Sequence, residues 1–497
     1  MSASREKNKR KEQSASGEAS VTPAKKGMSK GLKWTIGIIC LVLVIAVVTF
    51  FSMLTSGYFA SHTTAATVGN HKLTPAMVNY FYKEAYNSMS NQYGDMLSYI
   101  IDTNTPLDEQ YYDEEAGVTW ADNFIEQGLN NATQIYAIYD EALANGASLS
   151  DDDASNIDAT ISNLSIYGTY YGYSNVNGYI AAMYGTGCNE KNFREFLEIT
   201  TIANNYSQEV YNKPVYTETE LMDTYNADPN AYDGVDYRVF NVTDSLFDEE
   251  DEDKLAELKQ TAADEMLAAA EEGDEAFIKA AYDHASEATK DSYADDDYTL
   301  RTDVSHTETA LSDWLFDSAR QPGDATCIES NGVYYIAIFE ARRDHDFALP
   351  NVRHILISVS DTTDEEAMAA AKETADKLLA EYEAGEHTEE AFAAIGDAAY
   401  ADGTAAEAAR YEDITPGQMV TNFNDWAFDA SRQAGDVDVI ETDYGWHVMY
   451  FSGFGTNYRL KLVEDAQRSD AYNTWLSDTT DGVSYETASF GMRFVTK

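Results

Sequence analysis

Residues 311–324, Leu-Ser-Asp-Trp-Leu-Phe-Asp-Ser-Ala-Arg-Gln-Pro-Gly-Asp, recur at residues 423–436 as Phe-Asn-Asp-Trp-Ala-Phe-Asp-Ala-Ser-Arg-Gln-Ala-Gly-Asp. Each copy is followed by an alternating stretch that is typical of a strand and begins at Cys327 or Val439. Landmarks that return in the same order over such a length indicate an internal repeat.

The repeat extends upstream of these segments. The strand-like residues 237–242 correspond to residues 352–357, and each stretch precedes an acidic, alanine-rich helix pattern followed by Phe277 or Phe392. The sequence therefore predicts two tandem modules, at 235–345 and 350–456, each ordered strand–helix–helix–strand. This order is an α+β pattern, and ~110 residues is a usual domain size.

Charge is distributed unevenly along the 497 residues. The chain has 33 basic and 86 acidic residues, a net charge of −53, yet residues 1–33 hold nine of the basic residues and three of the acidic ones. The body is therefore strongly acidic, which argues against nucleic acid as a partner because phosphates would be repelled. We expect residues 1–33 to be a disordered basic tail.

Residues 34–54 are uncharged and almost wholly apolar. The length of this stretch, about 20 residues, is what a helix needs to cross a bilayer. The basic flank on the N-terminal side predicts a cytoplasmic N-terminus and an extracytoplasmic body. We therefore predict a single-pass transmembrane anchor at 34–55; a cleaved signal peptide, the alternative, usually has a shorter apolar stretch. The three cysteines cannot make a disulfide framework or a cysteine metal site.

Residues 65–230 predict a mainly helical, chaperone-like domain. Thr74 and Pro75 fit a helix start, a second helix spans Trp120 to about Asn145, and a third follows Ser150. Residues 166–187, rich in Tyr, Gly and Asn, are expected to be irregular, and a last helix carries Phe193 and Phe196.

The C-terminal segment, 457–497, predicts a helix at about 460–476 and then a strand-like tail ending at residues 492–496. Its amphipathic pattern suggests that it folds back onto the helical domain.

The second module resembles a parvulin-type peptidyl-prolyl isomerase. The residues that carry the resemblance occur in order over 350–456: Arg353-His354-Ile-Leu-Ile, Tyr400-Ala-Asp402, Gly417-Gln-Met419-Val, Phe423, Gly435-Asp and Thr442-Asp-Tyr-Gly445-Trp-His447-Val. The layout of the whole chain is similar to that of extracytoplasmic foldases of the PrsA and SurA kind. The resemblance implies a four-stranded antiparallel sheet surrounded by helices.

The resemblance also implies a site. His354 and His447 match the paired histidines of the family, Asp402 the acidic residue beside them, and Thr442 the hydroxyl of their hydrogen-bond network. Residues expected to hold the substrate proline are Met419, Phe423, Tyr411 and Phe428. Taken singly, a histidine or a Met and Phe four residues apart is usually structural; together, in family order, they favour a pocket.

The chemistry implied needs no metal or cofactor. Rotation about an X–Pro bond faces a barrier of about 18–20 kcal/mol from amide resonance. A catalyst has to bind the twisted amide more tightly than either planar form. The acidic run at 248–253 lacks the oxygen spacing and glycine of a calcium loop, so we interpret it as a solvated helix start.

Two features depart from the family pattern. Residues 409–413 lack the usual glycines, and Tyr411 stands where an apolar Leu is expected, so it could narrow or cap the pocket. In the first module, Val239 replaces the first histidine and Tyr334 aligns with the second. We therefore predict that 235–345 is a degenerate, non-catalytic parvulin-like domain.

The function predicted is that of a membrane-anchored extracytoplasmic folding factor that binds newly exported, unfolded chains and isomerises their X–Pro bonds. One alternative is a non-catalytic holdase whose two modules only bind. A further alternative, a cell-surface adhesion protein, rests only on the many tyrosines and the acidic body. The sequence leaves the client proteins and the oligomeric state open.

Overall fold

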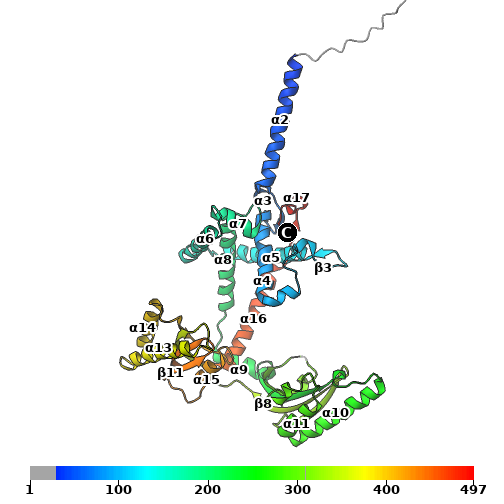
Figure 1. Ribbon diagram of the computed structural model, residues 1–497, viewed down its shortest axis with the longest axis vertical. Helices are drawn as coiled ribbons and strands as arrows, with labels where there is room; N and C mark the ends of the chain where they lie inside the picture. Colours follow the sequence, from blue (N-terminus) through cyan, green and yellow to red (C-terminus); the bar gives the residue numbers. More distant parts are fainter. Residues whose placement is uncertain (1–29, 308, 497) are drawn as a thin grey trace, which may run out of the picture. The chain divides into compact units, whose positions relative to one another are not determined.

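The computed structural model describes residues 30–307 and 309–496, whose elements are labelled in Figure 1. The chain separates into two compact units, one made of residues up to Val210 and from Thr474 onward, the other of Tyr211–Asn473. The helical domain was expected to extend to residue 230, but Leu221 and Tyr225 pack against Val463 of the second unit. The tail predicted at 1–33 lies almost wholly outside the described residues.

Helix α2, Lys30–Thr55, opens the described chain. Its segment Ile38–Thr55 has a mean hydropathy of 2.8 and is not buried against the rest of the protein. Within the described residues it is the one helix long and apolar enough to cross a membrane.

The first unit is mainly helical, with short strands at its edges. Its elements after α2 are α3 Tyr58–His62, β1 Ala66–Val68, β2 His71–Leu73, α4 Pro75–Tyr93, η1 Gly94–Tyr99, η2 Leu107–Glu109, β3 Tyr111–Asp113, β4 Val118–Thr119, α5 Trp120–Ala144, α6 Asp151–Tyr170, α7 Val176–Tyr184, α8 Glu190–Asn212, β13 Tyr485–Thr487 and α17 Ser489–Met492.

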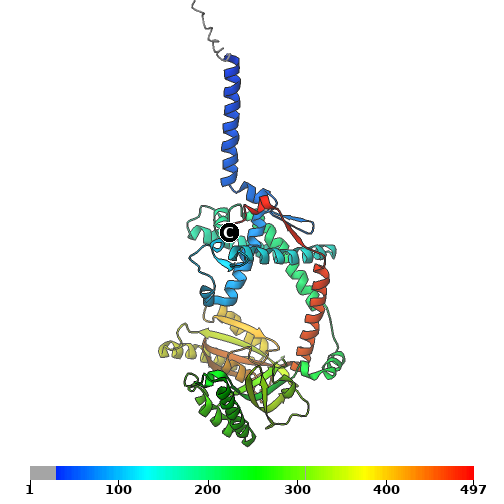
Figure 2. The same ribbon diagram turned by 90° about the vertical axis from the view of Figure 1, so that its right-hand side faces the viewer.

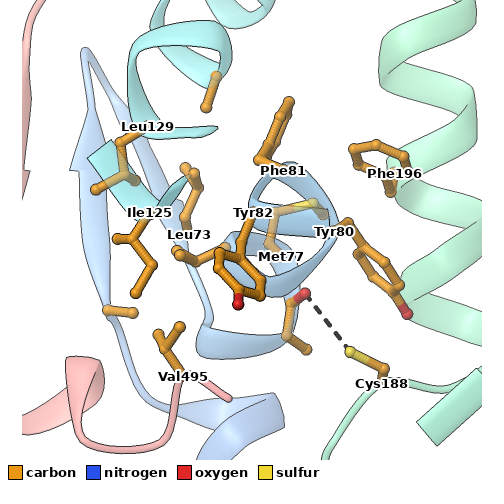
Figure 3. Close-up of a cluster of buried hydrophobic side chains, with 14 of the residues drawn as sticks. Leu73, Met77, Tyr80, Phe81, Tyr82, Ile125, Leu129, Cys188, Phe196 and Val495 are labelled. Carbon is orange, nitrogen blue, oxygen red and sulfur yellow. Dashed lines mark hydrogen bonds between the residues drawn. The ribbon is translucent and has the colours of Figure 1, made fainter. Parts of the chain in front are cut away.

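Helix α4 is at the centre of this unit. The hydroxyl oxygen of Thr74 accepts a hydrogen bond from the Met77 amide, and Pro75 occupies the first turn, so the predicted helix start is confirmed. Figure 3 shows the core around α4, where Leu73 and Phe81 lie between α5 and α8. The core is rich in aromatic rings, several of them fully buried: Tyr80, Phe81 and Phe124.

The prediction that 166–187 is irregular is wrong. Helix α6 continues to Tyr170, and α7 follows after a short turn. Asn175 caps α7 by accepting a hydrogen bond from the Gly178 amide at 3.0 Å, and Ile180 is fully buried in the core. Burial of an apolar face thus overrides the weak helix propensity of Gly, Asn and Tyr.

The chain end returns to the first unit, as predicted. Strand β13 pairs antiparallel with β1, and Val495 joins the core. Figures 1 and 2 show α17 beside α3, where Phe494 stacks on Phe59 with ring centroids 5.2 Å apart. The strand-like tail predicted at 492–496 is not a strand, since the strand lies earlier and the helical turn α17 follows it.

The second unit contains two four-stranded antiparallel sheets. Their orders are β6-β5-β8-β7 and β10-β9-β12-β11, so the strands of both repeats are arranged identically. The elements of this unit are α9 Glu218–Ala227, η3 Pro229–Ala231, β5 Gly234–Val242, η4 Asp244–Leu246, α10 Glu252–Glu272, α11 Asp274–His284, η5 Ser292–Ala294, β6 Leu300–Ser305, α12 Ser312–Leu315, β7 Ala325–Ser330, β8 Val333–Arg343, β9 Ala348–Ser358, α13 Glu365–Glu383, α14 Glu389–Ala401, β10 Glu407–Tyr411, α15 Thr421–Ala427, β11 Val437–Thr442 and β12 Gly445–Asn457; α16, Tyr458–Thr480, links it to the chain end.

Helices cover the two faces of the second sheet unequally. Long helices α13 and α14 pack on one face around Ile355 and Phe392, while the short α15 packs on the other around Val352 and Phe423. Because side chains alternate along a strand, neighbouring residues of β9 face opposite layers. The short helix leaves part of its face open, and this is where the site lies.

The acidic run at 248–253 leads into helix α10. The Asp251 carboxylate accepts a hydrogen bond from the Lys254 amide as the helix N-cap. This geometry confirms the interpretation as a helix start, and no cluster of metal-ligating side chains occurs in the described residues.

Candidate functional site

Strands β9 and β12 bring two histidines together. In their antiparallel register His354 pairs with Met449 and His447 with Leu356, so both imidazoles lie on the face that carries α15. His354 is 3% exposed and His447 is 5% exposed. The predicted pairing is therefore present in the fold.

A hydrogen-bond relay links these side chains. The two Nδ1 atoms of His354 and His447 lie 3.0 Å apart, and Nε2 of His447 lies 2.9 Å from Oγ1 of Thr442. Thr442 also accepts from the Tyr444 amide at 3.2 Å. The structure thus brings Thr442 together with the two histidines.

Both histidines are held neutral. Burial, with a smaller contribution from the neighbouring His354, lowers the pKa of His447 to about 4. Burial also lowers the pKa of His354, partly opposed by the nearby Glu407. A neutral imidazole has one donor and one acceptor nitrogen, so the relay has a direction.

The ends of the relay have further neighbours. The Thr442 hydroxyl also donates to the Gly445 carbonyl at 3.4 Å. The tautomers of the two rings set which imidazole donates in the bond between His354 and His447. At the other end, Nε2 of His354 lies 3.7 Å from the Glu407 carboxylate.

Glu407 is the carboxylate of the site, and the sequence pattern did not identify it. It lies on β10, where Ala409 pairs with His354, so Glu407 and Tyr411 share the face of the histidines. The Tyr411 hydroxyl donates to Glu407 at 2.8 Å, and burial with this bond raises the pKa of Tyr411 to about 12. Strand alternation through 407, 409 and 411 is the signal that could have identified it.

A cavity of about 290 Å³ opens above the relay. The Phe423 ring packs nearly perpendicular to both imidazoles, and the Tyr411 ring stacks on His354 with centroids 5.2 Å apart. The cavity thus has an aromatic and apolar wall next to a buried polar one. Its lining residues are His354, Leu356, Glu407, Tyr411, Gln418, Met419, Val420, Phe423, Tyr444 and His447.

Two predicted site residues lie elsewhere. Asp402 is an exposed residue at the C-terminus of α14, where its carboxylate accepts from the Thr404 amide, so its predicted place beside the histidines is wrong. The carboxylate that faces the histidines belongs to Glu407, which comes five residues after Asp402 at the start of β10. Phe428 packs edge-on against Phe347 and does not line the cavity.

Comparison with known families agrees with this geometry. Residues 334–452 match the PPIC-type PPIase domain, a range that takes in β9 to most of β12 and so includes both histidines, Glu407 and Thr442. This part of the chain is a parvulin domain. No curated protein matches the chain.

The first sheet has the strand order of the parvulin domain but not its polar site. By sheet register, Val239 stands at the position of His354, and Tyr335, not Tyr334 as predicted, stands at that of His447. Tyr334 points to the opposite layer, where its hydroxyl donates to Gln260. The family match begins only at residue 334.

A second, larger cavity lies in the helical unit. It measures about 740 Å³ and combines aromatic and apolar side chains with amides and one carboxylate. Its walls come from α4, α5 and the segment between them: Glu84, Ala85, Ser88, Met89, Gln92, Tyr93, Ile100, Tyr112, Trp120, Asn123, Gln127 and Asn131.

Proposed function

We propose that the protein is a membrane-anchored extracytoplasmic folding factor that binds unfolded exported chains and isomerises their X–Pro bonds. The observation that carries the proposal is the cavity of the parvulin domain, where an apolar wall of Met419 and Phe423 faces two neutral, buried histidines. A proline ring fits the apolar wall, and the preceding carbonyl reaches the polar side.

The site favours the transition state by its environment. When an X–Pro amide twists, it loses resonance and its nitrogen and carbonyl cease to share charge. A low-dielectric cavity with a fixed hydrogen-bond network stabilises the charge distribution of the twisted amide, because the groups of the network do not have to reorient when the amide twists. His354 and His447 keep the network in one direction because neither is charged at neutral pH. No step in this mechanism requires transfer of a proton to substrate.

Helix α2 supports the anchoring part of the proposal. Its apolar segment matches the thickness of a bilayer, and the basic residues before it favour a cytoplasmic N-terminus. A tether next to the site of export raises the local concentration of the protein, so modest affinity for each client suffices.

The chaperone part of the proposal rests on two further features. The 740 Å³ cavity offers Trp120, Tyr112 and Ile100 to apolar segments of a client. The first sheet, with Val239 and Tyr335 in place of the histidines, acts as a binding surface without catalysis. Together they extend the area that an unfolded chain can contact.

The test is cis/trans exchange of an X–Pro peptide followed by NMR in the presence of the whole chain in detergent. We expect acceleration by the wild type, a reduced rate for Glu407→Ala, and an unchanged rate for Asp402→Ala. The matched pair removes one carboxylate that faces His354 and one that is exposed at a helix end.

The same assay separates the alternatives. A folded chain that suppresses aggregation of an unfolded client but leaves peptide exchange unchanged would be a holdase, and the isomerase proposal would fail. The stacking of Tyr411 on His354 is the observation that favours this second candidate, because the ring narrows the entrance to the relay.

A further inference from the structure

The α6–α7 hairpin carries an exposed group of aromatic side chains. Tyr170 is 81% exposed and Tyr171 is 64% exposed, and Tyr179 stacks on Tyr171 with ring centroids 6.0 Å apart. Tyr173 packs against Tyr179 at 5.4 Å, and Ile166 and Tyr167 on α6 are also exposed. Exposed apolar groups that gather in this way mark an interaction surface.

The hairpin is also free of charge. Residues 159–189 contain no Asp, Glu, Lys or Arg, although 24% of the chain is charged. The same four residue types are missing from 34–71, a stretch that holds the apolar part of α2, helix α3 and the first strand. An acidic protein that approaches a lipid surface has to keep its carboxylates away from it, because their dehydration is costly.

The two uncharged stretches touch each other. The Ser61 hydroxyl donates to the Gly187 carbonyl at 2.9 Å, and a Cβ on Gly57 would lie 2.8 Å from the Gly187 amide nitrogen. Gly57 comes two residues after the end of α2, and Gly187 follows α7 closely. The end of the membrane helix is therefore fixed to the end of the hairpin, and Figure 1 shows α7 next to α3.

Basic side chains border this surface. Lys72 and Lys191, the first lysines after each uncharged stretch, line one cavity of about 180 Å³ together with His62 and a single carboxylate, Glu195. Both lysines are exposed, and they can reach lipid phosphates at the rim of an aromatic contact.

We propose that the α6–α7 hairpin lies on the membrane surface, with Tyr170 and Tyr171 at the level of the lipid headgroups. Tyrosine is enriched at membrane–water interfaces because its ring is apolar and its hydroxyl is polar. The hairpin then fixes the orientation of the first unit to the bilayer, which a single helix cannot do. This inference rests on the proposed anchoring by α2.

The test uses the whole chain in nanodiscs made of brominated phosphatidylcholine and phosphatidylglycerol. A fluorophore is attached at Val44→Cys in α2, at Tyr170→Cys, or at Tyr99→Cys, a 90% exposed position in η1. Cys40 and Cys327 are replaced by alanine, and Cys188 stays because it is buried. Bromine quenches a fluorophore only over a short distance.

Position 99 is the control within the same unit. It follows helix α4, whose 19 residues span about 28 Å at 1.5 Å per residue. Figure 1 shows α4 running away from α3, so its C-terminal end lies on the side of the unit opposite to α2.

We expect strong quenching at positions 44 and 170 and none at 99. Quenching at 44 but not at 170 would overturn the membrane contact while leaving the anchoring intact. An absence of quenching at 44 would overturn the anchoring and this inference with it. A label at 170 that responds only to a second copy of the chain or to an added unfolded client would assign the surface to that partner and refute the proposal.

Discussion

Acidification is expected to unfold the parvulin domain locally through His447. The imidazole is 5% exposed, and burial lowers its pKa from 6.5 to about 4. The folded domain therefore binds the proton less readily than the unfolded chain does. The stability that this provides is complete above pH 6.5 and is lost as the pH falls through the window down to about 4.

The size of the effect follows from the width of that window. A change of one pKa unit corresponds to about 1.4 kcal/mol, so protonation of His447 lowers the free energy of unfolding by roughly 3 kcal/mol on acidification. The pKa of His354 is lowered as well, so protonation of His354 also lowers the free energy of unfolding. A change of this size is a large fraction of the stability of an ordinary domain.

The assay is hydrogen exchange of the β9 and β12 amides in the whole chain between pH 7 and pH 4, with the variant His447→Gln for comparison. The glutamine cannot titrate but keeps a donor and an acceptor near Thr442. We expect the free energy of opening to fall more steeply with acid in the wild type. Equal pH dependence in both proteins, or an NMR titration of His447 near 6.5, would refute the reasoning.

Three further outcomes are expected. Thr442→Val leaves Nε2 of His447 without its hydrogen-bond partner and should lower the stability of the parvulin domain by about 1–3 kcal/mol. The measurement is hydrogen exchange of the β11 and β12 amides, which should become faster. Phe423→Ala removes a ring that is 2% exposed and should cost about 3–5 kcal/mol in the parvulin domain, with weaker peptide binding by NMR titration. Ser150→Ala breaks the capping box of α6 and should cost about 1 kcal/mol, visible as exchange in its first turn.

Much of the polar site could be predicted because it lies on regular strands. His354, His447 and Thr442 sit at fixed positions of β9, β11 and β12, and the repeat with the first module defined those strands in the sequence. The carboxylate could not be predicted in the same way. Its position depends on the length of the loop between α14 and β10, and an aspartate at a helix end such as Asp402 matches a motif equally well.

The errors elsewhere have a similar origin. The α6–α7 region contains turn-forming residues, yet Ile161 and Ile180 supply apolar faces that pack into the core. The local propensities of these residues indicated a loop, but burial of their apolar side chains in the core stabilises helices instead. Likewise, the first module has the same strand order as the parvulin domain, but only the register of β8 shows that Tyr335 takes the histidine position.

The pairing of β1 with β13 sets an order of events during synthesis. Strand β1 follows α2 and α3 closely, whereas β13 and Val495 are synthesised only after the whole second unit. The unit between them, Tyr211–Asn473, is continuous and can complete its sheets earlier. The first unit is thus begun before the second and completed after it, so a chain truncated before β13 would contain α2 but would lack a closed helical unit.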